Sequence, residues 1–415
     1  MSAEESKQAN GKAKAESTRD FTEQEEIVQT LHRIEASLQA MSTVPAVPLS
    51  HYRVLPQATK EAYEILEQGA ALIHGTSTKY TLLGKLDTVE QTKMSHDLRQ
   101  GCELIATACL VLHEKSTGSS LSLRKHVIQA SRAIVASTTH LLEAYTHGEA
   151  LASQQDLGAQ KTGAVWQMCS AVLDRKVPMG NRNAMRRDLL TYTIECQETM
   201  DEFQEVIEQG PAMESDDEPK KKDIAATANG ETEGDSWEAF LSGESQQYTT
   251  PKEMAVAQAA LAILKISRGA IKLSLQACDA VGDPLKESAP SNDEKPSAAE
   301  QHARLEWMRL LHEECCAVGE GVTDLGTIMY PPLKLSDVSL QLSKQMSRVE
   351  KVLHHVCDAT ITVHEEEEES DRAVPLELHV DVSSMAGKLQ SALQKRKEEV
   401  ITALFAVGCT MEGDS

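Results

Sequence analysis

The chain has 415 residues, of which 40% are hydrophobic, 25% are charged and only 3% are aromatic, and its formal net charge is −23. That length favours two domains, and the hydrophobic share is sufficient for a core in each. The low aromatic content favours helices over sandwiches and barrels, whose strands are rich in aromatic and β-branched residues. The negative charge repels phosphate backbones and anionic membrane surfaces, so we expect neither direct nucleic-acid contact nor membrane binding.

The N-terminal stretch MSAEESKQANGK is polar and charged, and we expect no signal peptide there. The longest apolar run, Ile105–Leu112, is far shorter than the roughly 20 residues that span a membrane. Nine cysteines are scattered without a repeating interval. We therefore expect free thiols in a reducing compartment, most of them buried on apolar helical faces.

Helical periodicity dominates the N-terminal half of the chain. After residues 1–20, which we expect to be disordered, apolar residues recur at helical spacing over residues 21–41, 62–70, 94–112, 123–145, 164–174 and 189–207. Gly148 and Gly210 follow two of these stretches and are suitable helix stops. We predict an N-terminal helical bundle over residues 21–210.

Residues 211–250 differ in character, because they are acidic, rich in Gly and Ser, and without a sustained period. We predict a disordered acidic linker there. Ser215 is followed directly by three acidic residues, as an acid-directed kinase requires, so it is a candidate phosphorylation site; a merely solvated linker is the alternative.

Helical periodicity resumes at Pro251, a suitable first-turn proline, and recurs over residues 251–282, 299–322, 335–363 and 382–407. The like charges of Glu365–Glu369 repel one another, so we predict an acidic loop over residues 364–371 and no strand. We predict a C-terminal helical bundle over residues 251–415. The fold class is therefore all-α, with two antiparallel helical bundles joined by an acidic flexible linker.

Tyr330, Pro331 and Pro332 interrupt this helical pattern. They are either a ligand for a domain that reads proline-rich segments or the point where one helix ends and the next begins. A proline reader needs a longer extended register. A residue before proline is pushed out of helical geometry, and the helical period resumes at once. We therefore interpret the three residues as a structural helix corner.

Histidines, cysteines and a glutamate gather in three groups, namely His140–Glu143–His147, His312–Cys315–Cys316 and His354–His355–Cys357. A di-iron bundle needs a second Glu-x-x-His pair, which the sequence lacks, and the other two groups lack the spacing of structural zinc sites. The sequence also contains no P-loop, dinucleotide fingerprint or nucleophile elbow. We predict a protein that is not an enzyme, with no catalytic residues, metal or cofactor.

Several stretches, in this order, resemble the cyclin-D-interacting protein family, also described as cyclin-D-binding or maternal Id-like proteins (GCIP). They are SLRKHVIQASRAIV (Ser122–Val135), AVWQMCSAVLD (Ala164–Asp174), the helix around LLTYTIECQETMDEF, the acidic linker and IMYPPL (Ile328–Leu333). The similarity spans about Leu121 to the C-terminus and is fainter before it. The first thirty residues and the Glu365–Glu369 run depart from the family pattern.

The resemblance implies an all-helical adaptor of the nucleus and cytoplasm that binds D-type cyclins. It also implies binding to helix-loop-helix transcription factors without a DNA-reading region, and negative regulation of cell-cycle progression and transcription. The acidic helical composition leaves two alternatives, a vinculin- or talin-like cytoskeletal or adhesion scaffold and a bundle metalloenzyme. The oligomeric state stays open.

Overall fold

The computed structural model describes residues 3–43, 56–83, 88–114, 117–152, 156–210, 248, 250–281, 297–331, 333–364, 371–376, 378 and 380–409. Across them, helices form nearly all of the regular structure, which confirms the predicted all-α class. The chain divides into two compact units, Met1–Met185 with Asp283–His302 and Arg186–Gly282 with Ala303–Ser415. We call them the first and the second unit.

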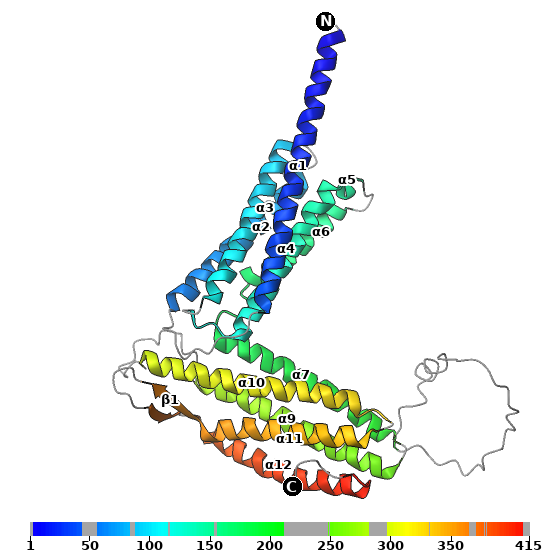
Figure 1. Ribbon diagram of the computed structural model, residues 1–415, viewed down its shortest axis with the longest axis vertical. Helices are drawn as coiled ribbons and strands as arrows, with labels where there is room; N and C mark the ends of the chain where they lie inside the picture. The colour runs from blue at the N-terminus through cyan, green and yellow to red at the C-terminus, as the bar shows by residue number, and fades with distance from the viewer. Residues whose placement is uncertain are drawn as a thin grey trace, which may run out of the picture. The chain divides into compact units, whose positions relative to one another are not determined.

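Long helices lying side by side form the first unit (Figure 1). They are α1 (Ala3–Ser42), α2 (Pro56–Leu83), α3 (Thr88–His113), α4 (Leu121–Thr146) and α6 (Leu157–Leu173), with the short α5 (Glu149–Ala152) before α6. α1 packs against α3 and α4, α2 against α3 and α6, and α4 against α3 and α6. The contiguous apolar core includes the fully buried side chains Leu31, Leu66, Leu98, Leu123 and Val165.

The sequence of α4 shows how these helices are specified. The Ser120 hydroxyl caps its start, because it accepts a hydrogen bond from the Leu123 amide at 3.2 Å. Ile134 and Leu141 lie on the same apolar face, and both are fully buried. Gly148 then adopts a φ of +75°, which favours glycine, and this confirms the predicted stop.

Two glycines allow α2 and α3 to approach closely. A Cβ at Gly69 would lie 2.8 Å from the Gly101 carbonyl oxygen, and a Cβ at Gly101 would lie 2.5 Å from Cγ1 of Ile73. Side chains at these positions would force the helices apart, so the backbones pack directly on each other.

A buried asparagine ties the start of α7 (Asn181–Glu208) to the turn before α4. Asn181 accepts a hydrogen bond from the Ser120 amide and donates one to the Gly118 carbonyl, each at 2.8 Å. The Asn181 side chain is fully buried, so it satisfies two backbone groups that water does not reach.

The remainder of α7 and the later helices form the second unit, where they run side by side (Figure 1). The later elements are α9 (Pro251–Val281), α10 (Ala298–Ile328), α11 (Leu335–Asp358), β1 (Thr360–His364), β2 (Asp371–Pro375) and α12 (Val380–Ala406). α9 packs against α11 and α12, which also contact each other. The buried Gln345 amide on α11 donates to the Ser267 hydroxyl on α9 at 2.9 Å and to the Val318 carbonyl on α10 at 3.1 Å.

A β-hairpin replaces the end of the helix predicted over residues 335–363. α11 ends at Asp358, Ala359 has a φ of +23°, and β1 then pairs antiparallel with β2. β1 is rich in β-branched residues, and its Ile361 and Val363 side chains are buried. Such residues favour a pleated, half-buried strand over a helix, so the prediction of helix beyond Asp358 is wrong.

Two boundaries differ from those predicted. α1 begins at Ala3, within the residues 1–20 for which disorder was predicted; its alanine, glutamate and lysine residues are strong helix formers. α7 was assigned to the bundle 21–210, yet it joins the second unit after Met185. The Tyr192 ring on this part of α7 packs on the backbone of α10, which belongs to the second unit at that point.

Several predicted features lie outside the described residues. They are most of the linker 211–250 with the candidate phosphorylation site Ser215, the second corner proline Pro332, and the acidic run Glu365–Glu369. The linker, the phosphorylation and the acidic loop therefore stay predictions.

Among the described residues, α9 is the one helix that is long and apolar enough to cross a membrane, judged by length and composition alone. Uninterrupted apolar runs in the sequence do not single it out, because polar residues such as Lys265 and Arg268 divide it. More than half of its most apolar stretch is buried, and its faces pack against α11 and α12. A helix at the centre of a bundle has the same composition.

Replacing Asn181 with Ala should lower the free energy of unfolding of the first unit by about 2 kcal/mol, because the Ser120 amide and the Gly118 carbonyl lose their buried partners. Asn183→Ala is the matched control on the same helix, since Asn183 is exposed. Urea unfolding followed by circular dichroism measures both changes. Equal effects of the two substitutions would contradict the assigned role of Asn181.

Candidate functional site

The predicted corner residues Tyr330 and Pro331 lie between α10 and α11. The Tyr330 hydroxyl donates a hydrogen bond to Glu202 on α7 at 2.9 Å. The buried Tyr248 hydroxyl donates to the carbonyl oxygen of Met329 at 3.0 Å. These two tethers fix the corner to α7 and to the segment that precedes α9.

Helix geometry separates the predicted groups of histidines and cysteines. His140 and His147 are exposed, and Glu143 between them accepts a hydrogen bond from His32 on α1 at 2.8 Å. Cys315 is fully buried, and burial raises the pKa of its thiol well above the ordinary value. Among the described residues, no group of three or more His, Cys, Asp or Glu side chains is arranged to hold a metal ion.

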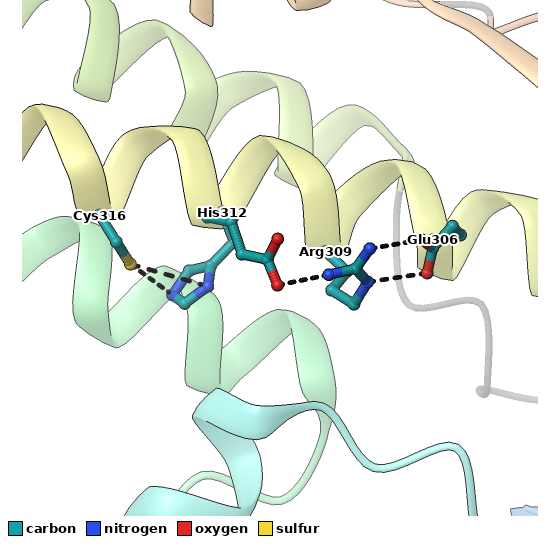
Figure 2. Close-up of polar contacts among 5 residues, drawn as sticks. Glu306, Arg309, His312 and Cys316 are labelled. Carbon is teal, nitrogen blue, oxygen red and sulfur yellow. Dashed lines mark hydrogen bonds and ion pairs between the residues drawn. The ribbon is translucent and has the colours of Figure 1, made fainter. Parts of the chain in front are cut away.

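His312 and Cys316 on α10 instead form a cluster with α7, which we call the His312 cluster. His312 Nε2 lies 3.0 Å from Asp188 Oδ2, and both side chains are nearly buried, with exposed fractions of 11% and 14%. Cys316 Sγ lies 3.5 Å from His312 Nε2 and 3.8 Å from Nδ1. Figure 2 shows the Cys316 sulfur facing the imidazole ring.

The His312 cluster favours the charged form of the imidazole. Burial alone lowers the pKa of His312, but the hydrogen bonds to Asp188 and Cys316 outweigh burial and raise the pKa to about 9. Burial, and next the nearby Cys316, raise the pKa of Tyr192 on the facing side of α7. His312 is therefore a buried cation at neutral pH, with Asp188 as its counter-ion.

One turn before His312 on α10, Arg309 forms a second charged group (Figure 2). Its Nε donates to Glu306 at 2.8 Å, a second nitrogen bonds the same carboxylate, and a third bonds Glu313. The hydrogen bond to Glu306 is the main reason why the pKa of Arg309 is raised. These partners lie one turn away on the same helix, so they stabilise α10 itself.

A pocket of about 250 Å³ lies between α10, α11 and β1. Its lining residues are Trp307, Glu314, Lys351, His354, His355, Asp358 and Thr360. His355 lies 3.4 Å from Glu314, and its ring centroid is 5.1 Å from that of Trp307. The sequence grouped His355 only with its helix neighbours, because periodicity does not reveal contacts between elements far apart in the chain.

In the first unit, an exposed tryptophan on α6 lies against α2. Trp166 is 39% exposed, stacks on His74 with ring centroids 5.7 Å apart, and donates from Nε1 to the Thr78 hydroxyl at 3.1 Å. Leu82, one turn after Thr78 on α2, is 68% exposed. We call His74, Thr78, Leu82 and Trp166 the Trp166 surface; it combines two exposed apolar side chains, Leu82 and Trp166, with the polar residues that hold the tryptophan ring in place.

The stability of the second unit should depend on pH through His312. Its pKa is raised from 6.5 to about 9, so the protonated pair with Asp188 contributes fully below about pH 6.5, and that contribution is lost as the pH rises through about 9. Between these values the loss is on the order of 3 kcal/mol. His312→Gln should remove this dependence, and urea unfolding at pH 6, 7.5 and 9 measures it. His354→Gln is the control, because His354 is exposed. If the free energy of unfolding changed with pH equally in wild type and in His312→Gln, the assignment would be contradicted.

Two glycines of α10 should respond to alanine in opposite directions. A Cβ at Gly319 would lie 2.2 Å from the Tyr192 ring, whereas one at Gly326 would make an ordinary contact with Thr199 at 3.5 Å. Gly319→Ala should cost about 1–3 kcal/mol through overpacking. Gly326→Ala should stabilise by up to ~1 kcal/mol, because alanine favours helix. Thermal unfolding of both variants measures the difference, and a shift of the same sign in each would contradict the close contact at Gly319.

Comparison with known proteins finds a family match over residues 65–209, from α2 to just beyond the end of α7. The matching family model is described as Grap2 and cyclin-D-interacting, N-terminal. The match begins earlier than the resemblance seen in the sequence and ends before Ile328–Leu333, so the likeness at IMYPPL stays a prediction. No curated protein sequence matches the chain. A domain of this description is therefore detected at residues 65–209.

Proposed function

We propose that the protein is a non-catalytic adaptor that binds D-type cyclins, helix-loop-helix transcription factors or both, and that it negatively regulates cell-cycle progression and transcription. The family match over residues 65–209 carries the proposal, since the matching family is described as cyclin-D-interacting. We further propose that the protein acts in both nucleus and cytoplasm.

The Trp166 surface supports binding of a helical partner. A helix that docks on a bundle places apolar anchors at i, i+3, i+4 and i+7 against an apolar area. Trp166 is suited to receive such anchors, because its hydrogen bond to Thr78 and its stacking on His74 hold the ring before a partner arrives. A prepositioned tryptophan loses little conformational freedom on binding, and tryptophan is enriched among the residues that dominate binding energy.

The acidic balance of the chain supports the choice of partner class. With a net charge of −23, the protein attracts basic partner surfaces and repels nucleic acid. Charge of this kind raises the rate of association more than the final affinity. A partner helix with basic flanks therefore suits the overall charge of the chain.

Calorimetric titration of the full chain with a purified D-type cyclin tests the proposal. Trp166→Ala should weaken binding roughly tenfold, because it removes an exposed, prepositioned aromatic side chain that a bound partner would cover. Phe405→Ala is the matched control, since Phe405 is 75% exposed but lies on α12 in the second unit. Circular dichroism checks that both variants fold.

The possible outcomes test cyclin binding and the role of the Trp166 surface separately. Absence of binding by the wild-type chain would overturn cyclin binding, and co-sedimentation with actin filaments would then favour a cytoskeletal scaffold. Cyclin binding that Trp166→Ala leaves unchanged would overturn only the role of the Trp166 surface.

A further inference from the structure

We propose that Cys316 is a reactive thiol and a site of oxidative modification, which hydrogen peroxide converts to a sulfenic acid. The site is the His312 cluster in the second unit, where a cysteine, a histidine and an aspartate from two helices meet. No part of the proposed cyclin binding requires this chemistry.

The contact with His312 gives Cys316 its reactivity. The thiolate is the nucleophilic form of cysteine, and an adjacent imidazolium favours it over the thiol. The His312 ring lies 3.5 Å from the sulfur, and its other partner, Asp188 at 3.0 Å, holds the ring in place and stabilises its positive charge. Because the ring is buried, water does not screen this charge as it would at the surface.

The remaining groups near the sulfur define its surroundings. Tyr192 and Asp188 face Cys316 and His312 from α7, and Glu320 lies one turn further along α10. The raised pKa of Tyr192 keeps its hydroxyl neutral at physiological pH. His312 is therefore the cation next to the sulfur, and Asp188 balances that cation directly.

Cys316 combines two properties that the other cysteines do not share. Cys102, Cys109, Cys169, Cys196, Cys278 and Cys315 are buried. Cys357 is exposed, but burial of its sulfur and the adjacent Asp358 raise the pKa of its thiol. Cys409 is half-buried and donates to the Leu335 carbonyl at 3.6 Å. Cys316 is half-buried and lies beside the His312 imidazole, and no other cysteine combines these two features among the described residues.

The proposed reaction is a two-electron oxidation. The Cys316 thiolate attacks one peroxide oxygen, the S–O bond forms and the O–O bond breaks. The departing hydroxide takes a proton from the His312 imidazolium and leaves as water. The thiolate, the peroxide and the His312 proton therefore give a sulfenic acid, one water and a neutral imidazole, with sulfur oxidised and peroxide reduced.

Labelling of the full chain at pH 7 tests this inference. The protein is treated with one equivalent of hydrogen peroxide in the presence of dimedone, and peptide fragmentation locates each sulfenic adduct. Cys316 should be labelled on the order of tenfold more than Cys357, although Cys357 is the more exposed. Labelling that follows exposure, with Cys357 ahead of Cys316, would overturn the proposal.

Two histidine variants separate the role of the imidazolium from that of access. His312→Gln should reduce labelling of Cys316 to the level of Cys357. His354→Gln removes an exposed histidine one turn before Cys357, and it should leave the labelling of Cys316 unchanged. The buried Cys315 reports folding, because it stays unlabelled in any folded variant. If Cys315 becomes labelled in the His312→Gln variant, that variant is not folded, and Asp188→Asn is used for the test in its place. Undiminished labelling of Cys316 in a folded variant would overturn the role of His312.

Discussion

The approach of α7 to α10 in the second unit depends on the close contact between the Tyr192 ring and the backbone of Gly319. A Cβ at Gly319 would lie 2.2 Å from the ring, so only glycine lets α7 approach α10 this closely. That approach brings Asp188, one turn before Tyr192, within hydrogen-bond distance of His312. A buried imidazole without a counter-ion would lose its proton, so the ion pair depends on the packing and stabilises it in return.

The His312–Asp188 pair lies deeper than the ion pairs on the exposed helix faces. Pairs such as Lys60–Glu64 and Arg99–Glu103 join exposed residues one turn apart, and water and salt weaken them. The His312–Asp188 pair joins two helices at a nearly buried position. Its loss would leave one charge buried without a partner, and that is why its protonation affects the fold.

The sequence predicted those features that depend on local chemistry. Periodicity and end signals predicted α4 with its stop at Gly148, and the start of α9 at Pro251, because caps, glycines and prolines act within a few residues. Helical spacing likewise predicted that most cysteines are buried, and six of the nine are. β1 was missed because a short apolar stretch after a helix fits the helical period as well as it fits a strand.

The features that depend on long-range contacts could not be predicted in the same way. Asp188 and His312 are 124 residues apart, and nothing in either local sequence indicates their pairing. The sequence grouped His312 with its neighbours Cys315 and Cys316 alike. In the structure, Cys315 is fully buried while Cys316 lies beside the ring, since adjacent residues of a helix point in different directions. The division of α7 between the two units likewise depends on contacts with helices far away in the sequence.

The proposed partner binding and the proposed thiol oxidation involve different compact units of the chain. The Trp166 surface belongs to the first unit, within the residues that match the cyclin-D-interacting family, whereas Cys316 lies in the second unit, beyond that match. A sulfenic oxygen on Cys316 would occupy space beside Tyr192 and His312, at the seam that joins α7 to α10. Oxidation should therefore act first on the packing of the second unit.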